Sequence, residues 1–240
     1  MTKGNEHLLH HMEVFHCVPE NGQSTEFPIW SGPCGAEDAP EKLQHCKKVL
    51  AAWAIGAGPF TYPAEAGLQI GGPDFGSLFV MLEVHFNNEK LESGVKDNSG
   101  MRFIVSQQLR SHDAGIMELG LVYTDKMAIP PNQDSFPLHG YCLPQCSAVV
   151  SLVISQSKIG CLVINFLQGF PRSGINIFGS QLHTHGTGME VETRHFRDGL
   201  ELEEINRDNH YSTHFQEIRP LHTIKKVLPV RYSEIQKSCA

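Results

Sequence analysis

The sequence predicts an all-β protein built as one or two β-sandwiches, and three observations support this. Glycine and proline are abundant, with 22 and 14 among 240 residues, and only 19% of residues are charged. Disordered chains, coiled coils and long helical bundles have a different balance. Short alternating, β-branched or aromatic runs recur along the chain, and turn-forming clusters such as 19–22 and 97–100 separate them. The length allows one large domain or two small ones with a sizeable core.

The expected strands are short and follow in chain order. They are Met12–Phe15, Leu78–Phe86, Arg102–Gln107, Leu119–Tyr123, Gly174–Leu182 and Val191–Phe196. Residues 40–54 leave two alternatives open. Leu43, Cys46 and Val49 lie near helical spacing, whereas 51–55 equally suits a buried strand.

Charge and hydropathy narrow the classes of partner. The formal net charge of −7 provides no general basic surface, so nucleic acid is not expected as a partner. No run reaches 18 apolar residues, so no transmembrane helix is expected. The first 15 residues contain no apolar run of signal-peptide length, although seven cysteines are more typical of an exported chain.

Histidine is unusually frequent, with 14 residues against 19 lysines and arginines. Histidine is the commonest metal ligand. His183 and His185 are two residues apart, so on a strand they would point to one face and could reach one ion. The same spacing also suits two ordinary histidines on a polar face.

Two further patterns are weaker when each is taken alone. His10 and His11 are adjacent and would leave a regular strand on opposite faces, so sharing an ion requires a bulge, a strand end or an imidazole bending round through Nδ1. The pair could equally be a solvated doublet. His85 shares a strand face with Glu83 and could be structural. Sites of His, or of His with Met, suit copper and zinc, so a zinc-binding sandwich without redox activity is a further alternative.

The remaining histidines are not expected to bind metal. His210 and His214 are placed in a polar loop. The others are expected at the surface: His7, His16, His45, His112, His139, His195 and His222. The sequence contains no nucleophile elbow, Walker loop, zincin motif or dinucleotide fingerprint.

Several motifs taken together resemble one enzyme family. They are His-His-Met-Glu-Val-Phe at 10–15, Ala-Ala-Trp-Ala-Ile-Gly at 51–56, Leu-Glu-Val-His at 82–85, Gln-Leu-His-Thr-His at 181–185, Asn-His-Tyr at 209–211 and Phe-Gln-Glu at 215–217. As an ordered set they resemble the copper type II, ascorbate-dependent monooxygenases, in the dopamine beta-hydroxylase-like branch.

The resemblance implies two jelly-roll-like antiparallel β-sandwich domains, 1–110 and 111–240, the second incomplete. His10, His11 and His85 would bind an electron-transfer copper. His183 and His185 would bind the catalytic copper, where oxygen is activated. Ascorbate would donate electrons and O2 would be the co-substrate. The substrate would be a small-molecule aromatic amine of the phenylethylamine type, hydroxylated at its benzylic carbon, as in catecholamine metabolism.

The resemblance also implies a disulfide between Cys17 and Cys46, worth about 3 to 4 kcal/mol. It leaves Cys34, Cys142 and Cys146 without family partners in this chain. The expected location is the secretory pathway, a secretory vesicle or the extracellular space, and homo-oligomerisation stays open.

The chain departs from the family in three ways. No methionine occupies the position of the family's downstream methionine ligand at the second copper. Residues 149–170 have the character of an apolar insertion, and the tail 222–240 diverges. We therefore expect a truncated form. The alternative to an active enzyme is a catalytically inactive copper-binding or interaction protein.

Overall fold

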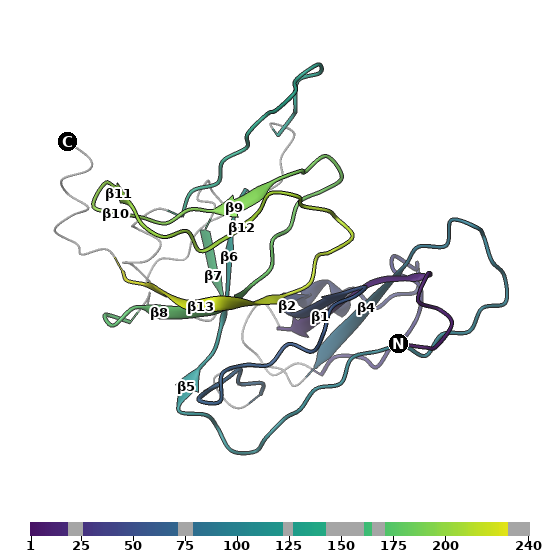
Figure 1. Ribbon diagram of the computed structural model, residues 1–240. Coiled ribbons are helices and arrows are strands. Elements are labelled where there is room, and N and C mark those ends of the chain that lie inside the picture. The colour runs from purple at the N-terminus through teal and green to yellow at the C-terminus, as the bar shows by residue number, and fades with distance from the viewer. Residues whose placement is uncertain (19–25, 72–78, 122–126, 143–160, 165–170, 230–240) are drawn as a thin grey trace. The chain divides into compact units, whose positions relative to one another are not determined.

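The computed structural model describes residues 1–18, 26–71, 79–121, 127–142, 161–164 and 171–229, and it confirms the all-β class (Figure 1). Nearly all its regular elements are strands, and nearly all strand pairings are antiparallel. The chain divides into two compact units, residues 1–114 with 178–225, and residues 115–177 with 226–240. Within the described residues, no helix is long and apolar enough to cross a bilayer.

The largest sheet has three strands in the order β2, β1, β4 (Figure 1). β1 (Leu9–Cys17) is central and pairs antiparallel with both β2 (Cys46–Ala54) and β4 (Val80–Phe86). Along β1, Met12, Val14 and His16 are buried, whereas Glu13 and Phe15 between them are half-buried. This alternation fits a strand with one face on the core, as the sequence pattern predicts.

The ambiguous segment 40–54 proves to be two elements. A short 3-10 helix, η1 (Glu41–His45), leads directly into β2, so the strand alternative is correct for 51–54. Ala52 and Ala54 are buried in β2, where small side chains allow close packing.

The disulfide between Cys17 and Cys46 is confirmed. It joins the end of β1 to the start of β2, and both cysteines are buried with Phe27 in a small core cluster. Cys142 also takes part in a disulfide, so the expectation that it has no partner in this chain is wrong. Cys34 is free and exposed.

Shorter pairings complete the fold. β9 (Val191–Thr193) pairs with β12 (Asn206–Asp208), and β10 (Phe196–Arg197) pairs with β11 (Leu200–Glu201). Asp198 and Gly199 both have positive φ at the β10–β11 turn, as a two-residue type I′ hairpin turn requires.

The remaining strands form three more pairs. β8 (Ile175–Ser180) pairs with β13 (Arg219–Val227), and β6 (Ile116–Leu119) pairs with β7 (Cys161–Ile164). A parallel pairing joins two-residue strands, β3 (Ala66–Gly67) and β5 (His112–Asp113). The sequence pattern did not predict β13.

Some expectations from the sequence are wrong. Residues 102–107 form no strand. Ile104 is 96% exposed, so burial of its side chain does not stabilise a strand there. The strand expected at 119–123 ends at Leu119, and residues 122–123 lie outside the described residues. His16, expected at the surface, is buried in β1.

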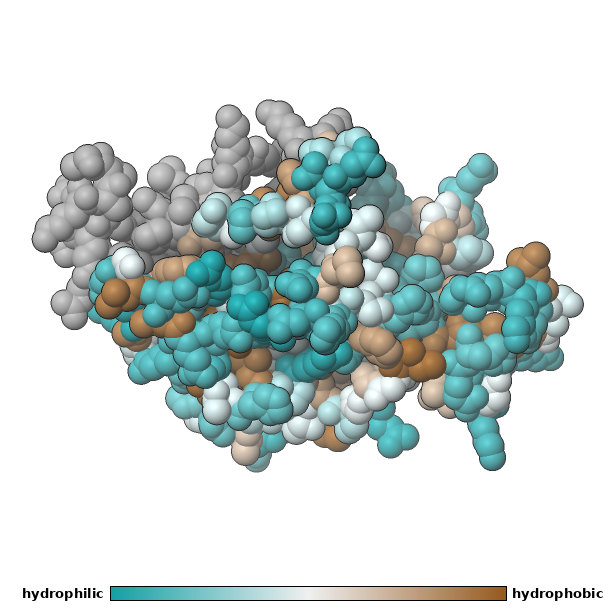
Figure 2. All heavy atoms as spheres, turned by 45° about the horizontal axis from the view of Figure 1, so that its top comes forward, coloured by the Kyte–Doolittle hydropathy of each residue, from teal (hydrophilic) through white to brown (hydrophobic). Residues whose placement is uncertain are grey.

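Hydrophobic side chains reach the surface in several regions, and Figure 2 shows them among hydrophilic ones on one face. On β4, Val80, Leu82 and Phe86 are each more than 40% exposed. These residues share a strand with His85, so one face of the sheet that carries the histidines is only partly covered.

Candidate metal centre

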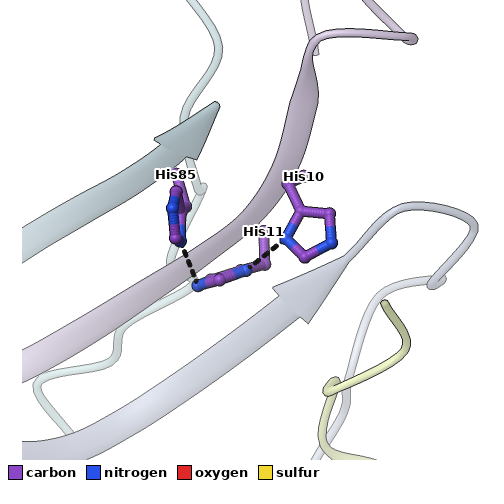
Figure 3. A group of neighbouring side chains, drawn as sticks. All are labelled: His10, His11 and His85. Carbon is purple, nitrogen blue, oxygen red and sulfur yellow. Dashed lines mark hydrogen bonds between the residues drawn. The ribbon is translucent and has the colours of Figure 1, made fainter. Parts of the chain in front are cut away.

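The backbone register sets His11 and His85 side by side. His11 on β1 pairs directly with His85 on β4, so both side chains leave the same face of the sheet. Their rings are 4.6 Å apart between centroids, and His85 Nδ1 lies 3.2 Å from His11 Nε2 (Figure 3). Two residues 74 positions apart in the chain thus become neighbours through strand pairing.

A β-bulge brings His10 into the same group. Leu9 pairs with Phe86 and His11 with His85. Between these two pairs β1 contains one extra residue, His10, which β4 does not match. The bulge removes the objection that adjacent strand residues face opposite ways. His10 Nδ1 then lies 2.8 Å from His11 Nδ1 (Figure 3).

The spacing of the three rings fits ligands of one metal ion. Each histidine offers one nitrogen within 4.8 Å of those of the others. A metal–nitrogen bond of about 2.0 Å, plus about 1.1 Å from the nitrogen to the ring centre, puts each ring centre about 3.1 Å from the ion. Two ring centres on one ion are then about 4.4 Å apart when the two metal–nitrogen bonds are perpendicular, and about 6.2 Å apart when these bonds are opposite. The observed separations are 4.6, 5.0 and 5.9 Å. His11 approaches His10 with Nδ1 and His85 with Nε2, so the His11 ring must rotate before all three histidines can bind one ion.

Burial and neighbouring imidazoles lower the pKa of His10 and His11. Burial, followed by His85, His10 and His183, lowers the pKa of His11 to about 4. Burial, followed by His214 and His85, also lowers the pKa of His10. A neutral imidazole has a free lone pair, so no proton has to leave these two residues before metal binds at neutral pH.

His183 and His185 lie beyond the strand on which they were expected. β8 ends at Ser180, and both histidines follow in an irregular segment. Their ring centroids are nevertheless 5.3 Å apart, within the range for two imidazoles on one ion. The structure therefore brings the pair together, but not through strand alternation.

Two side chains hold this irregular segment. The buried Tyr211 hydroxyl accepts a hydrogen bond from the Thr184 N–H at 3.0 Å and donates one to the Thr184 carbonyl at 3.1 Å. His183 Nδ1 lies 2.5 Å from Gln216 Oε1. An amide oxygen only accepts, so Nδ1 carries the proton and Nε2 keeps its lone pair for a ligand.

His214 is a candidate that the sequence argument missed. It lies in a loop, as expected, but its ring centroid is 5.0 Å from that of His10. The only signal in the sequence is the position of His214 between two of the family motifs, 209–211 and 215–217. That signal says nothing about distance from residue 10.

Comparison with sequence models of known families gives two matches. The model described as copper type II ascorbate-dependent monooxygenase, N-terminal domain, matches residues 1–93. The model of the C-terminal domain of the same family matches residues 112–157 and 153–239. Together they contain all five histidines of the two candidate sites.

Individual relatives agree with the family match. The chain is 49% identical to dopamine beta-hydroxylase of Homo sapiens over 229 residues, which is 95% of this chain and 33% of that protein. It is 44% identical to tyramine beta-hydroxylase of Caenorhabditis briggsae, with 95% of this chain and 34% of that protein covered. It is 32% identical to the human DBH-like monooxygenase protein 1, over 95% of this chain and 34% of that protein. The chain thus spans about a third of the length of these relatives.

Proposed function

The chain belongs to the copper type II ascorbate-dependent monooxygenase family, and from this premise we propose that it binds copper at two sites and hydroxylates the benzylic carbon of a phenylethylamine-type amine. Ascorbate is the proposed electron donor and O2 the co-substrate. The observation that carries the proposal is the bulged cross-strand trio His10, His11 and His85, whose spacing suits one ion.

The trio is proposed as the electron-transfer site. Three imidazoles supply soft-to-borderline nitrogen donors, a set that suits copper and zinc better than the hard cations. Two of the three ligands come from rigid, paired strands, so the sheet fixes their separation before any ion arrives.

His183 and His185 are proposed as ligands of the catalytic copper. Gln216 fixes the His183 tautomer, and Tyr211 fixes the backbone between the two histidines. Bound copper supplies one-electron redox chemistry and oxygen activation. The chain contributes two imidazoles from a segment that Tyr211 and Gln216 hold in place.

A second candidate function is a catalytically inactive copper-binding or interaction protein. It is kept because no methionine of this sequence matches the family's third ligand position at the second copper. In this candidate function the protein binds copper at His10, His11 and His85 but does not catalyse hydroxylation.

We also propose the division into domains 1–110 and 111–240. The match to the N-terminal model ends at residue 93 and the match to the C-terminal model begins at residue 112, which supports a boundary between them. The match to the C-terminal model consists of two segments that overlap at residues 153–157, inside the proposed insertion 149–170. These residues lie outside the described residues apart from 161–164.

Location in the secretory pathway, in a secretory vesicle or outside the cell is proposed too. The Cys17–Cys46 disulfide supports it, because disulfides persist in oxidising compartments. A homo-oligomer stays a proposal that sedimentation of the purified chain would test.

Copper content and coupled oxygen uptake test the function. We expect two coppers per wild-type chain, one per His183→Ala/His185→Ala chain, and ascorbate-dependent oxygen uptake that rises with tyramine or dopamine in the wild type alone. One copper and no coupled uptake in the wild type would establish the inactive alternative. Zinc binding without any copper binding would overturn both.

A further inference from the structure

We propose that His214 supplies a fourth imidazole to the first site in its Cu(II) state, beside His10, His11 and His85. The inference rests on the proposed assignment of that site to copper. It adds a ligand outside the three-histidine set that the family resemblance implies.

The geometry of His10 points to this role. Its ring lies 5.0 Å from His11, 5.9 Å from His85 and 5.0 Å from His214, measured between centroids. All three separations fall between about 4.4 and 6.2 Å, the range for imidazoles that share one ion. His10 and His214 both belong to the first compact unit.

The hydrogen bonds of His214 leave the correct nitrogen available. Ser212 Oγ lies 3.2 Å from His214 Nδ1 and also accepts the backbone N–H of His214 at 3.3 Å. A hydroxyl oxygen has two lone pairs and can accept both bonds. In the tautomer in which Nδ1–H donates to Ser212, Nε2 keeps its lone pair, which is the usual arrangement of a metal-binding histidine with an outer partner.

The loop that carries His214 is braced by an internal hydrogen bond and tied to the sheet after His214. Gln216 donates from Nε2 to the Thr213 carbonyl, and Ile218 N–H donates to the Ala52 carbonyl on β2 at 3.3 Å. β2 is the direct neighbour of β1, so the anchor holds the loop against the sheet that carries His10. His214 itself is exposed, which leaves its side chain room to turn.

The same loop also carries Gln216, which holds His183. One short segment therefore contacts both histidine groups. Cu(II) favours tetragonal sites with four nitrogen or oxygen donors, and three imidazoles leave one such position open. An exposed imidazole on an anchored loop beside His10 is the donor that this chain offers.

The test isolates the first site in the full-length His183→Ala/His185→Ala chain. Pulsed EPR of the Cu(II)-loaded protein counts bound imidazoles, and a competition titration with a chelator gives the Cu(II) Kd. In this background we compare His214, His214→Ala and His214→Gln, with His210→Ala as matched control because His210 is an exposed histidine of the same loop.

We expect both His214 variants to lose one imidazole and to raise the Kd by more than about 10-fold, because the loss of a ligand should cost at least as much as the loss of an outer hydrogen-bond partner. Free imidazole should restore the lost signal in His214→Ala. The His210→Ala chain should match the background chain. An unchanged imidazole count and Kd in the His214 variants, with copper still bound, would overturn this inference alone. No copper in any form would overturn the copper assignment as well.

Discussion

His11 and His85 are direct cross-strand partners, with His85 Nδ1 3.2 Å from His11 Nε2. The sheet holds them together without help from a ligand. Removing either ring should therefore empty the first site without disturbing the backbone register.

We predict that His85→Ala lowers the copper content by one ion per chain. The loss of affinity should exceed the roughly 10- to 100-fold that loss of an outer hydrogen-bond partner causes, because a ligand itself is removed. Metal analysis after dialysis measures this. His112→Ala is the control, since His112 is exposed on the separate strand β5; equal losses in the two variants would argue against the site.

Tyr211→Phe should loosen the second site selectively. The change removes one accepted and one donated hydrogen bond to Thr184, each worth about 0.5 to 1.5 kcal/mol. In a His85→Ala background, copper titration should show weaker binding at the remaining site. Tyr141→Phe changes an exposed tyrosine and should leave that affinity unaltered.

Breaking the Cys17–Cys46 disulfide should destabilise the fold by about 3 to 4 kcal/mol, since it closes a loop of 29 residues and its sulfurs lie in a buried cluster. Guanidinium unfolding of Cys17→Ser/Cys46→Ser measures the change. Cys34→Ser, at a free exposed thiol, should unfold at the wild-type midpoint. A wild-type midpoint in the double variant would contradict the prediction.

Asp97 should give an acid-sensitive contribution to stability. Hydrogen bonds, the largest from the Asn5 side chain, lower the pKa of Asp97 from 3.8 to about 2. A carboxyl with a lower pKa in the folded state stabilises fully above its unfolded pKa and loses this effect as the pH falls through the folded pKa. Asp97→Asn should therefore melt below the wild type at pH 5, and the gap should close toward pH 2.

The control for that titration is Asp134→Asn, at an exposed loop aspartate. Its melting temperature should follow the wild type throughout the pH range. A constant gap between Asp97→Asn and the wild type from pH 5 to pH 2 would show that ionisation of Asp97 is not the cause.

Local patterns predicted the class of fold and most strands around the histidines. The expected strand at 12–15 forms within β1, where Met12 and Val14 are buried, and the expected strand at 78–86 forms as β4 through its pairing with β1. The same reasoning failed at 102–107, where the apolar residues find no partner strand and Ile104 stays exposed. Alternation is a necessary feature of such a strand, but pairing decides whether it forms.

The candidate site was predictable in its residues but not in its geometry. The sequence left a bulge, a strand end or a bent imidazole open at His10, and the register of β1 against β4 shows a bulge. It placed His183 and His185 on a strand, whereas Tyr211 and Gln216 hold them beyond one. It could not bring His214 to His10, because a contact across 204 residues has no local signature.

The bulged trio also implies an order of events during synthesis and folding. His10 and His11 emerge together, but His85 joins them only after a chain segment of 74 residues has closed, which is a slow, non-local step. Before that step the nascent chain offers an ion two donors at most from this group. Tight metal capture therefore reports that β4 has docked, and a metal-loading assay on refolding protein would time the assembly of this sheet.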